Sequence, residues 1–139
     1  MDGTNSKLGG LPPTSNTLNY KEHKRVQTSH FIVADFIIVK PCELFFDENL
    51  TLKEDYDYTL QHIEKYGEVT RVEYILAEFA HKSNSGGAVA VRTPELEQKN
   101  IEFLISKWGH GRIMINKKRE NEIVLKRFRN DPKEGFFLS

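Results

Sequence analysis

The sequence predicts an α/β fold with a mixed β-sheet and flanking helices. Three observations support this class: an early run rich in Val, Ile and Phe, two segments with apolar residues at helical spacing, and two short apolar runs near the C-terminus. Their order is strand, helix, strand, helix, strand, strand, which is typical of a mixed sheet covered by helices. With 139 residues, the chain has the length of one domain or of a piece of a larger domain.

The first half of the chain predicts one extended region and one helix. Residues 30–41 are expected to form one bent strand or two short strands, with the break near Ala34 and Asp35. A helix is expected over about 53–66, where apolar residues recur at helical spacing, and Gly67 closes it as a C-cap.

The second half predicts a strand, a second helix and two short strands. Residues 69–79 alternate for part of their length and indicate a strand. The second helix begins with Thr93 as N-cap and Pro94 at its first position, and Gly109 ends it. The last strands are expected over 112–115 and 122–125.

Three regions are expected along the chain. Residues 1–28 are rich in Gly, Pro, Ser, Thr and Asn and show no apolar period, so we expect a flexible N-terminal segment without a buried strand. The folded domain is expected over 29–127, followed by a C-terminal tail over 128–139.

No apolar run is long enough to cross a bilayer, and the N-terminus lacks the apolar centre of a signal peptide. We therefore expect no membrane partner and an intracellular location, cytoplasmic or nuclear. A protein that a phage or virus encodes would have this location inside the host cell. The single Cys42 fits this location, because one cysteine forms no internal disulfide.

Charge is balanced overall but unevenly spread. Residues 43–64 hold seven Asp or Glu against one Lys, and residues 107–129 hold eight Lys or Arg against two Glu. Two solvated faces of opposite sign explain this pattern most simply. The alternative is a metal or catalytic centre beside a surface that binds a polyanion such as DNA.

Three carboxylates crowd the start of the first predicted helix, namely Glu54, Asp55 and Asp57. Ordinary charging of a helix N-terminus accounts for them, and the pattern alone favours that interpretation. A general base with supporting charges is the functional alternative. The string Asp55-Tyr56-Asp57 also matches the D-x-D metal motif, but that motif belongs in a loop after a buried strand, so we do not assign it here.

His81 follows a predicted strand end and precedes the loop Ser-Asn-Ser-Gly-Gly. Its imidazole could bind a divalent metal or a phosphate oxygen, and the two glycines would let backbone N–H groups approach an anion. A surface histidine in a polar loop is an equally good interpretation.

Several runs together resemble the TET/JBP-associated glycosyltransferase family. They are FIVADFIIVKP, FDENLTLKEDYDYTLQHIEKYG, HKSNSGGAVAVRTPELE, SKWG and NKKRENEIVLK, and the resemblance covers about residues 29–126. The resemblance implies a nucleotide-sugar enzyme with a GT-A-like fold that acts on oxidised pyrimidines in DNA, such as hydroxymethylated bases. Transfer to a protein or a small molecule is an alternative, because a fold does not determine the acceptor.

The resemblance also implies residue roles. Asp55 would be the general base of an inverting, metal-dependent transfer from a UDP-sugar, with Glu54 and Asp57 orienting the acceptor or the base. His81 would help to hold the Mn²⁺ or Mg²⁺. The donor phosphates would meet Lys82, Asn84, Gly86, Gly87 and Arg92. The DNA backbone would meet Lys117, Lys118, Arg119, Lys126 and Arg127.

The resemblance covers only the C-terminal portion of a GT-A domain. Residues 1–28 carry no D-x-D motif and no expected nucleotide-binding strand. Three explanations stay open: a split gene, a truncated relic, or one of two associating chains, of which the second would supply the donor-binding half. The alternative is a non-catalytic module that binds DNA or a partner.

Overall fold

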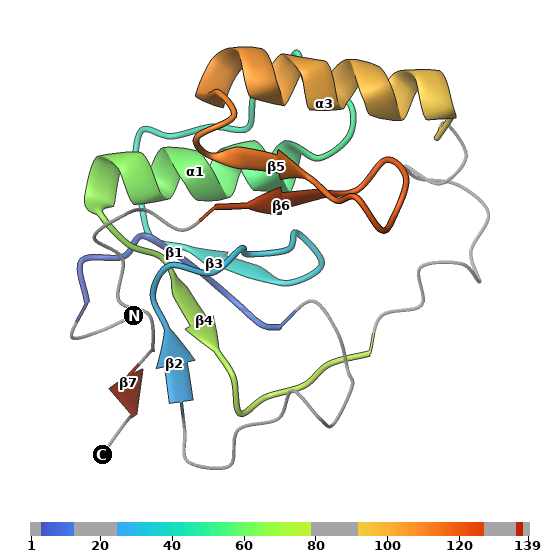
Figure 1. Ribbon diagram of the computed structural model, residues 1–139. Coiled ribbons are helices and arrows are strands. Elements are labelled where there is room, and N and C mark those ends of the chain that lie inside the picture. The colour runs from blue at the N-terminus through green and yellow to red at the C-terminus, as the bar shows by residue number, and fades with distance from the viewer. Residues whose placement is uncertain (1–3, 13–24, 79–91, 127–135, 138–139) are drawn as a thin grey trace.

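The structure, a computed structural model, describes residues 4–12, 25–78, 92–126 and 136–137. These residues form a mixed α/β fold with a five-stranded sheet, two helices and a separate two-stranded hairpin (Figure 1). The elements are β1 (Leu8–Gly10), β2 (Arg25–Gln27), β3 (Ile37–Val39), α1 (Glu54–Tyr66), β4 (Thr70–Val72), α3 (Pro94–Trp108), β5 (Ile113–Ile115), β6 (Ile123–Leu125) and β7 (Phe136–Phe137). The predicted coarse class is confirmed.

The sheet has the strand order β3-β1-β4-β2-β7. Strands β1 and β4 are parallel, and the other neighbours are antiparallel. Strand β7 lies inside the expected C-terminal tail and pairs with β2. The sheet is therefore mixed, as expected, but it draws strands from both ends of the chain.

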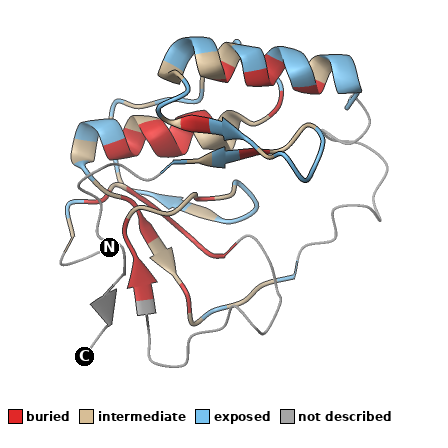
Figure 2. Ribbon diagram, viewed as in Figure 1, coloured by how far each residue is buried: buried red, intermediate tan, exposed pale blue. Residues whose placement is uncertain are grey.

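Helix α1 is the central layer of the molecule, because it packs on both sides. Tyr58 and Ile63 join a cluster with Leu8 of β1. Leu60 joins a second cluster that α3 and the β5–β6 hairpin complete, through residues such as Ile101 and Ile113. Figure 2 shows buried residues along α1, between the sheet and the other helix. Because α1 packs in both core clusters, its side chains have fixed positions, so it can hold the residues of a site rigidly.

The expectation of no buried strand in residues 1–28 is wrong. All three residues of β1 are buried, and β1 lies inside the sheet between β3 and β4. The strand was missed because it has only three residues, of which two are glycines, too few for an apolar period. Gly10 is required there by packing, since a Cβ at this position would lie 2.6 Å from Ile32 Cγ2.

Residues 30–41 contain one strand, β3, after a turn at Ala34 and Asp35. The break is where the sequence predicted it, but the first half forms no strand. The reason is a local competitor for hydrogen bonds: the Thr59 hydroxyl accepts from Ile32 N at 3.2 Å and donates to Ile32 O at 3.3 Å. Ile32 is 1% exposed, so it packs in the core without belonging to the sheet.

The remaining elements follow the predictions in position, with shorter strands. The helices begin and end as expected: Gly67 caps α1 and Thr93 caps α3 through a bond from Leu96 N. The strand expected over 69–79 is shortened to β4, and the two last strands form the β5–β6 hairpin.

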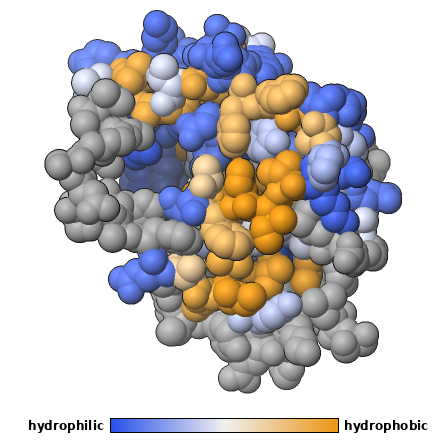
Figure 3. Space-filling model, turned by 180° about the vertical axis from the view of Figure 1, so that it is seen from behind, coloured by the Kyte–Doolittle hydropathy of each residue, from blue (hydrophilic) through white to orange (hydrophobic). Residues whose placement is uncertain are grey.

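Apolar side chains remain on the surface of the described residues. Figure 3 shows apolar residues gathered in the middle of the rear face. The large exposed ones are Phe36, Ile38, Val39, Phe45, Phe46, Ile75, Met114, Ile115 and Val124. Within the described ranges, no helix is long and apolar enough to cross a membrane.

Candidate active site

The three acidic residues of the first turn of α1 have different surroundings. Lys53 precedes them with φ 60° and ψ 24°, and its side chain forms no cap bond. The positive end of the helix dipole therefore meets Glu54, Asp55 and Asp57 directly, which stabilises negative charge. These residues project from the helix in different directions. Asp55 lies at the turn that contains Ala34, whereas Asp57 is buried in a network of polar contacts.

The Asp55 carboxylate is held by backbone N–H groups. Ala34 N donates to Oδ2 at 3.2 Å, and Tyr56 N donates to Oδ1 at 3.0 Å. Burial raises the pKa of this carboxyl from 3.8 to about 6, the N–H bond from Ala34 opposes the rise, and the charge of Glu54 adds to it. Burial outweighs the two N–H bonds, so the pKa of Asp55 lies above the usual range of an aspartate.

The neighbour of Asp55 contributes an apolar wall. The Tyr56 ring stacks on Phe31 with centroids 4.1 Å apart, and its hydroxyl donates to Ile123 O at 3.2 Å. Burial, and next the charge of Asp55, raise the pKa of Tyr56 to about 12. Tyr56 therefore stays protonated and gives the start of α1 a fixed, uncharged surface.

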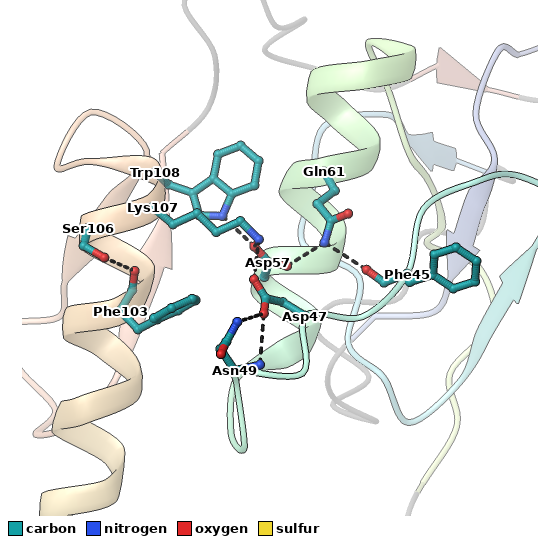
Figure 4. A network of polar contacts seen from close by, with 9 residues as sticks. All are labelled: Phe45, Asp47, Asn49, Asp57, Gln61, Phe103, Ser106, Lys107 and Trp108. Carbon is teal, nitrogen blue, oxygen red and sulfur yellow. Dashed lines mark hydrogen bonds and ion pairs between the residues drawn. The ribbon is translucent and has the colours of Figure 1, made fainter.

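Asp57 lies in a different environment, where it is fully buried with 0% exposure. Oδ1 accepts from Trp108 Nε1 at 2.8 Å and pairs with Lys107 Nζ at 2.8 Å, while Oδ2 accepts from Gln61 Nε2 at 2.6 Å (Figure 4). Because no face of the carboxylate reaches solvent, Asp57 offers no open surface to an acceptor, and the alternative that it orients the base stays a prediction. Its partners make it a connector between α1 and the end of α3.

The same network extends into the loop before α1. Lys107 Nζ also pairs with Asp47 Oδ2 at 2.8 Å, and Asp47 Oδ1 accepts from the backbone and side chain of Asn49 (Figure 4). Gln61 Nε2 donates onward to Phe45 O at 3.0 Å. Lys107 therefore bridges two carboxylates and ties the loop, α1 and α3 together.

A second set of contacts joins the starts of the two helices. Glu97 of α3 lies 2.7 Å from Lys53 Nζ through Oε2, in an ion pair without hydrogen-bond alignment, and 3.5 Å from Arg92 Nε through Oε1. Arg92 is exposed. The structure thus places Arg92, an expected phosphate ligand, beside the residue that precedes Glu54 and Asp55.

The other predicted site residues fall into two groups. His81, Lys82, Asn84, Gly86, Gly87 and Arg127 lie outside the described residues. Lys117, Lys118, Arg119 and Lys126 are exposed on the β5–β6 hairpin or at its tip. In the described part of the chain, no group of three or more His, Cys, Asp or Glu side chains could hold a metal ion.

A surface hollow of about 420 Å³ lies between the 49–51 loop and α3, apart from the expected acids. Asn100 is one of the residues that line it, and its side-chain oxygen accepts from Thr51 N and Leu52 N at 3.1 Å each. The polar capacity of Asn100 is used within the protein, since its amide nitrogen donates to Leu96 O and Thr51 Oγ1.

Sequence reasoning missed the parts of this region that depend on contacts between distant residues. Lys107 and Trp108 were assigned no site role, although a Lys and a Trp in the last helical turn are able to reach a neighbouring carboxylate. His62 was also passed over. It is 0% exposed, and within the described part of the chain neither ring nitrogen has a hydrogen-bond partner. Burial lowers its pKa to about 4.

Comparisons with protein-family models, curated proteins and solved structures give no match to this chain.

Proposed function

We propose that this chain is part of a nucleotide-sugar-dependent, inverting glycosyltransferase that modifies a hydroxymethylated pyrimidine in DNA. The observation that carries the proposal is Asp55, a partly buried carboxylate with a pKa of about 6 at the start of the central helix. A general base works best when its pKa lies near the working pH. With its pKa of about 6, Asp55 is largely ionised at pH 7 and ready to accept a proton.

The proposed step assigns Asp55 one proton transfer. The acceptor hydroxyl gives its proton to a carboxylate oxygen of Asp55 while its own oxygen bonds to the anomeric carbon of the sugar. The bond from that carbon to the nucleotide diphosphate breaks, and the diphosphate leaves with the electron pair. Ala34 N and Tyr56 N use one lone pair on each carboxylate oxygen, so further lone pairs remain for the proton.

Glu54 and Arg92 are the supporting residues in this proposal. Glu54 is only partly buried, and its charge raises the pKa of Asp55. Arg92 contacts Glu97 through Oε1, whereas Lys53 contacts it through Oε2. From there the Arg92 guanidinium can meet an oxygen of the donor diphosphate. Asp57 is left out of the reacting set because it is fully buried and paired with Lys107.

The divalent metal enters this proposal through His81. The described residues offer no metal-binding group, so no step is assigned to the ion. When bound, it would stabilise the negative charge of the departing diphosphate.

The test is a transfer assay with UDP-sugars, Mn²⁺ and hydroxymethylated DNA, run with the chain alone and with a candidate donor-binding chain. The proposal predicts transfer by the unaltered chain and a loss of about 10²–10⁴-fold in Asp55→Asn. Glu48→Gln, which alters an exposed carboxylate in the loop before α1, is the matched control and should keep full activity. Transfer that survives Asp55→Asn contradicts the assignment of the base.

A second candidate is a DNA-binding module without transfer activity, and the exposed basic hairpin favours it. It predicts DNA binding that weakens steeply with salt. It also predicts no rise in melting temperature when UDP and Mn²⁺ are added, because neither would bind the folded state.

A further inference from the structure

The outer face of the β5–β6 hairpin joins apolar and basic side chains. Met114 lies opposite Val124, and the cross-strand bonds Lys126 N to Arg112 O and Asn116 N to Glu122 O extend the same register. Side chains on this face alternate with those that enter the core, such as Ile113 and Ile123. The outer face therefore carries three cross-strand pairs: Arg112 with Lys126, Met114 with Val124, and Asn116 with Glu122.

The apolar pair is open to solvent. Met114 is 42% exposed and Val124 is 43% exposed. Ile115, at the end of β5 next to the tip, is 53% exposed. By the same alternation Ile115 lies on the face of Ile113, so Met114 and Val124 form the exposed apolar surface of the outer face, and contiguous exposed apolar surface marks a contact site.

Basic groups lie beyond this apolar pair at both ends: Arg112 and Lys126 on one side, and Lys117 and Lys118 at the tip, past the Asn116–Glu122 pair. Residues 112–126 hold five Lys or Arg against two Glu. The ammonium groups of Lys117, Lys118 and Lys126 form no ion pair with any described residue, whereas Arg119 lies 3.5 Å from Glu122. The hairpin therefore keeps at least three cations available for an anionic partner.

We infer that the outer face of the β5–β6 hairpin binds duplex DNA, with the lysines on the phosphates and the Met114–Val124 pair pressed against a base step that it unstacks. Protein interfaces deplete charged residues around their apolar centre, whereas proteins that bend or open DNA combine basic side chains with apolar wedges such as Met and Ile. This inference rests on the proposed function, in which the target base must leave the stack to reach Asp55.

The test measures binding and unstacking without any sugar donor. The full chain is titrated with a short duplex that carries 2-aminopurine, whose fluorescence rises when the base is unstacked. We expect binding that weakens with salt and a fluorescence rise at saturation. Met114→Ser/Val124→Ser should lose most of that rise while its salt dependence stays unchanged.

A second variant separates the phosphate contacts from the wedge. Lys117→Gln/Lys118→Gln should reduce the slope of log K against log salt by about 2, since each phosphate contact contributes about 1. Ile75→Ser is the matched control, because Ile75 is exposed, at 47%, but lies outside the hairpin. It should leave both readouts unchanged.

Two results would overturn the inference. One is that the unaltered chain does not bind the duplex at low salt, which would assign this face to another partner such as a protein. The other is a full fluorescence rise in Met114→Ser/Val124→Ser. A chain that unstacks DNA but transfers no sugar would contradict the proposed function and leave this inference standing. A chain that transfers sugar but does not unstack the duplex would contradict this inference and leave the proposed function standing.

Discussion

Replacing Lys107 tests the network that joins α3 to α1. Lys107 Nζ lies 2.8 Å from both Asp57 Oδ1 and Asp47 Oδ2. Burial alone would lower the pKa of Lys107, but the bonds to Asp47 and Asp57 outweigh it and raise the pKa. Lys107→Met keeps the length of the side chain and removes its charge, which leaves Asp57 buried without its cation.

The expected loss of stability is about 2–3 kcal/mol. Breaking a fully buried ion pair from one side costs about 3–5 kcal/mol. The Lys107 side chain is 31% exposed, so water screens part of its attraction. Trp108 Nε1 and Gln61 Nε2 continue to donate to Asp57 in the variant, which reduces the cost further.

Urea unfolding of four proteins measures this effect: the unaltered chain, Lys107→Met, Asp57→Asn and the double variant. The cycle should give a coupling energy of about 1–2 kcal/mol between the two residues. Lys99→Met is the control, because Lys99 is an exposed lysine on the same helix and should change stability by less than about 0.5 kcal/mol. A coupling energy near zero would refute the role of Lys107 as a bridge.

Three further predictions concern buried polar groups. In Asp55→Asn, the folded state no longer holds a carboxyl with a pKa raised from 3.8 to about 6, a difference of about 3 kcal/mol. A carboxyl with a raised pKa destabilises the folded state as pH rises through this window. The Asn side chain forms weaker bonds to the backbone N–H groups, so the free energy of unfolding of the variant should rise by about 1–2 kcal/mol at pH 7 and stay unchanged near pH 4. Urea unfolding at both pH values measures this. His62 has a folded pKa of about 4 against 6.5, so its contribution to stability should fall by about 3 kcal/mol as pH drops from 6.5 to 4, which offsets the opposite contribution of Asp55 in the same window. His62→Phe should therefore gain stability relative to the unaltered chain as pH falls, in an unfolding series over pH. Asn100→Ala should cost about 2–4 kcal/mol, because it leaves Thr51 N and Leu52 N without their acceptor; a loss below 1 kcal/mol in thermal unfolding would contradict this.

The helices could be predicted from the sequence because their signals are local. The stop at Gly67 and the start at Thr93-Pro94 each depend on a few adjacent residues, and the structure has both caps. The β5–β6 hairpin could also be predicted, since two apolar runs flank a polar turn. The first-turn acids of α1 were also found, because the pattern of charge at a helix N-terminus is visible in the sequence itself.

The sheet and the roles of the acids could not be predicted in the same way. Strand β1 is too short and too rich in glycine for a periodic pattern, and it is held by β3 and β4, which come later in the chain. The partner of Ile32 is the hydroxyl of Thr59, on a helix. Asp55 and Asp57 are two residues apart, and only contacts from Ala34 and Trp108 decide which carboxylate is available and which is buried.

The most direct test of the central claim is the pH dependence of kcat/KM for sugar transfer to hydroxymethylated DNA. If Asp55 is the base, kcat/KM of the unaltered chain should rise about tenfold per pH unit below about 6 and level off above it. Asp55→Asn should lose that dependence together with most of the activity. Absence of transfer with every sugar nucleotide tried, or a profile that Asp55→Asn leaves unchanged, would contradict the account.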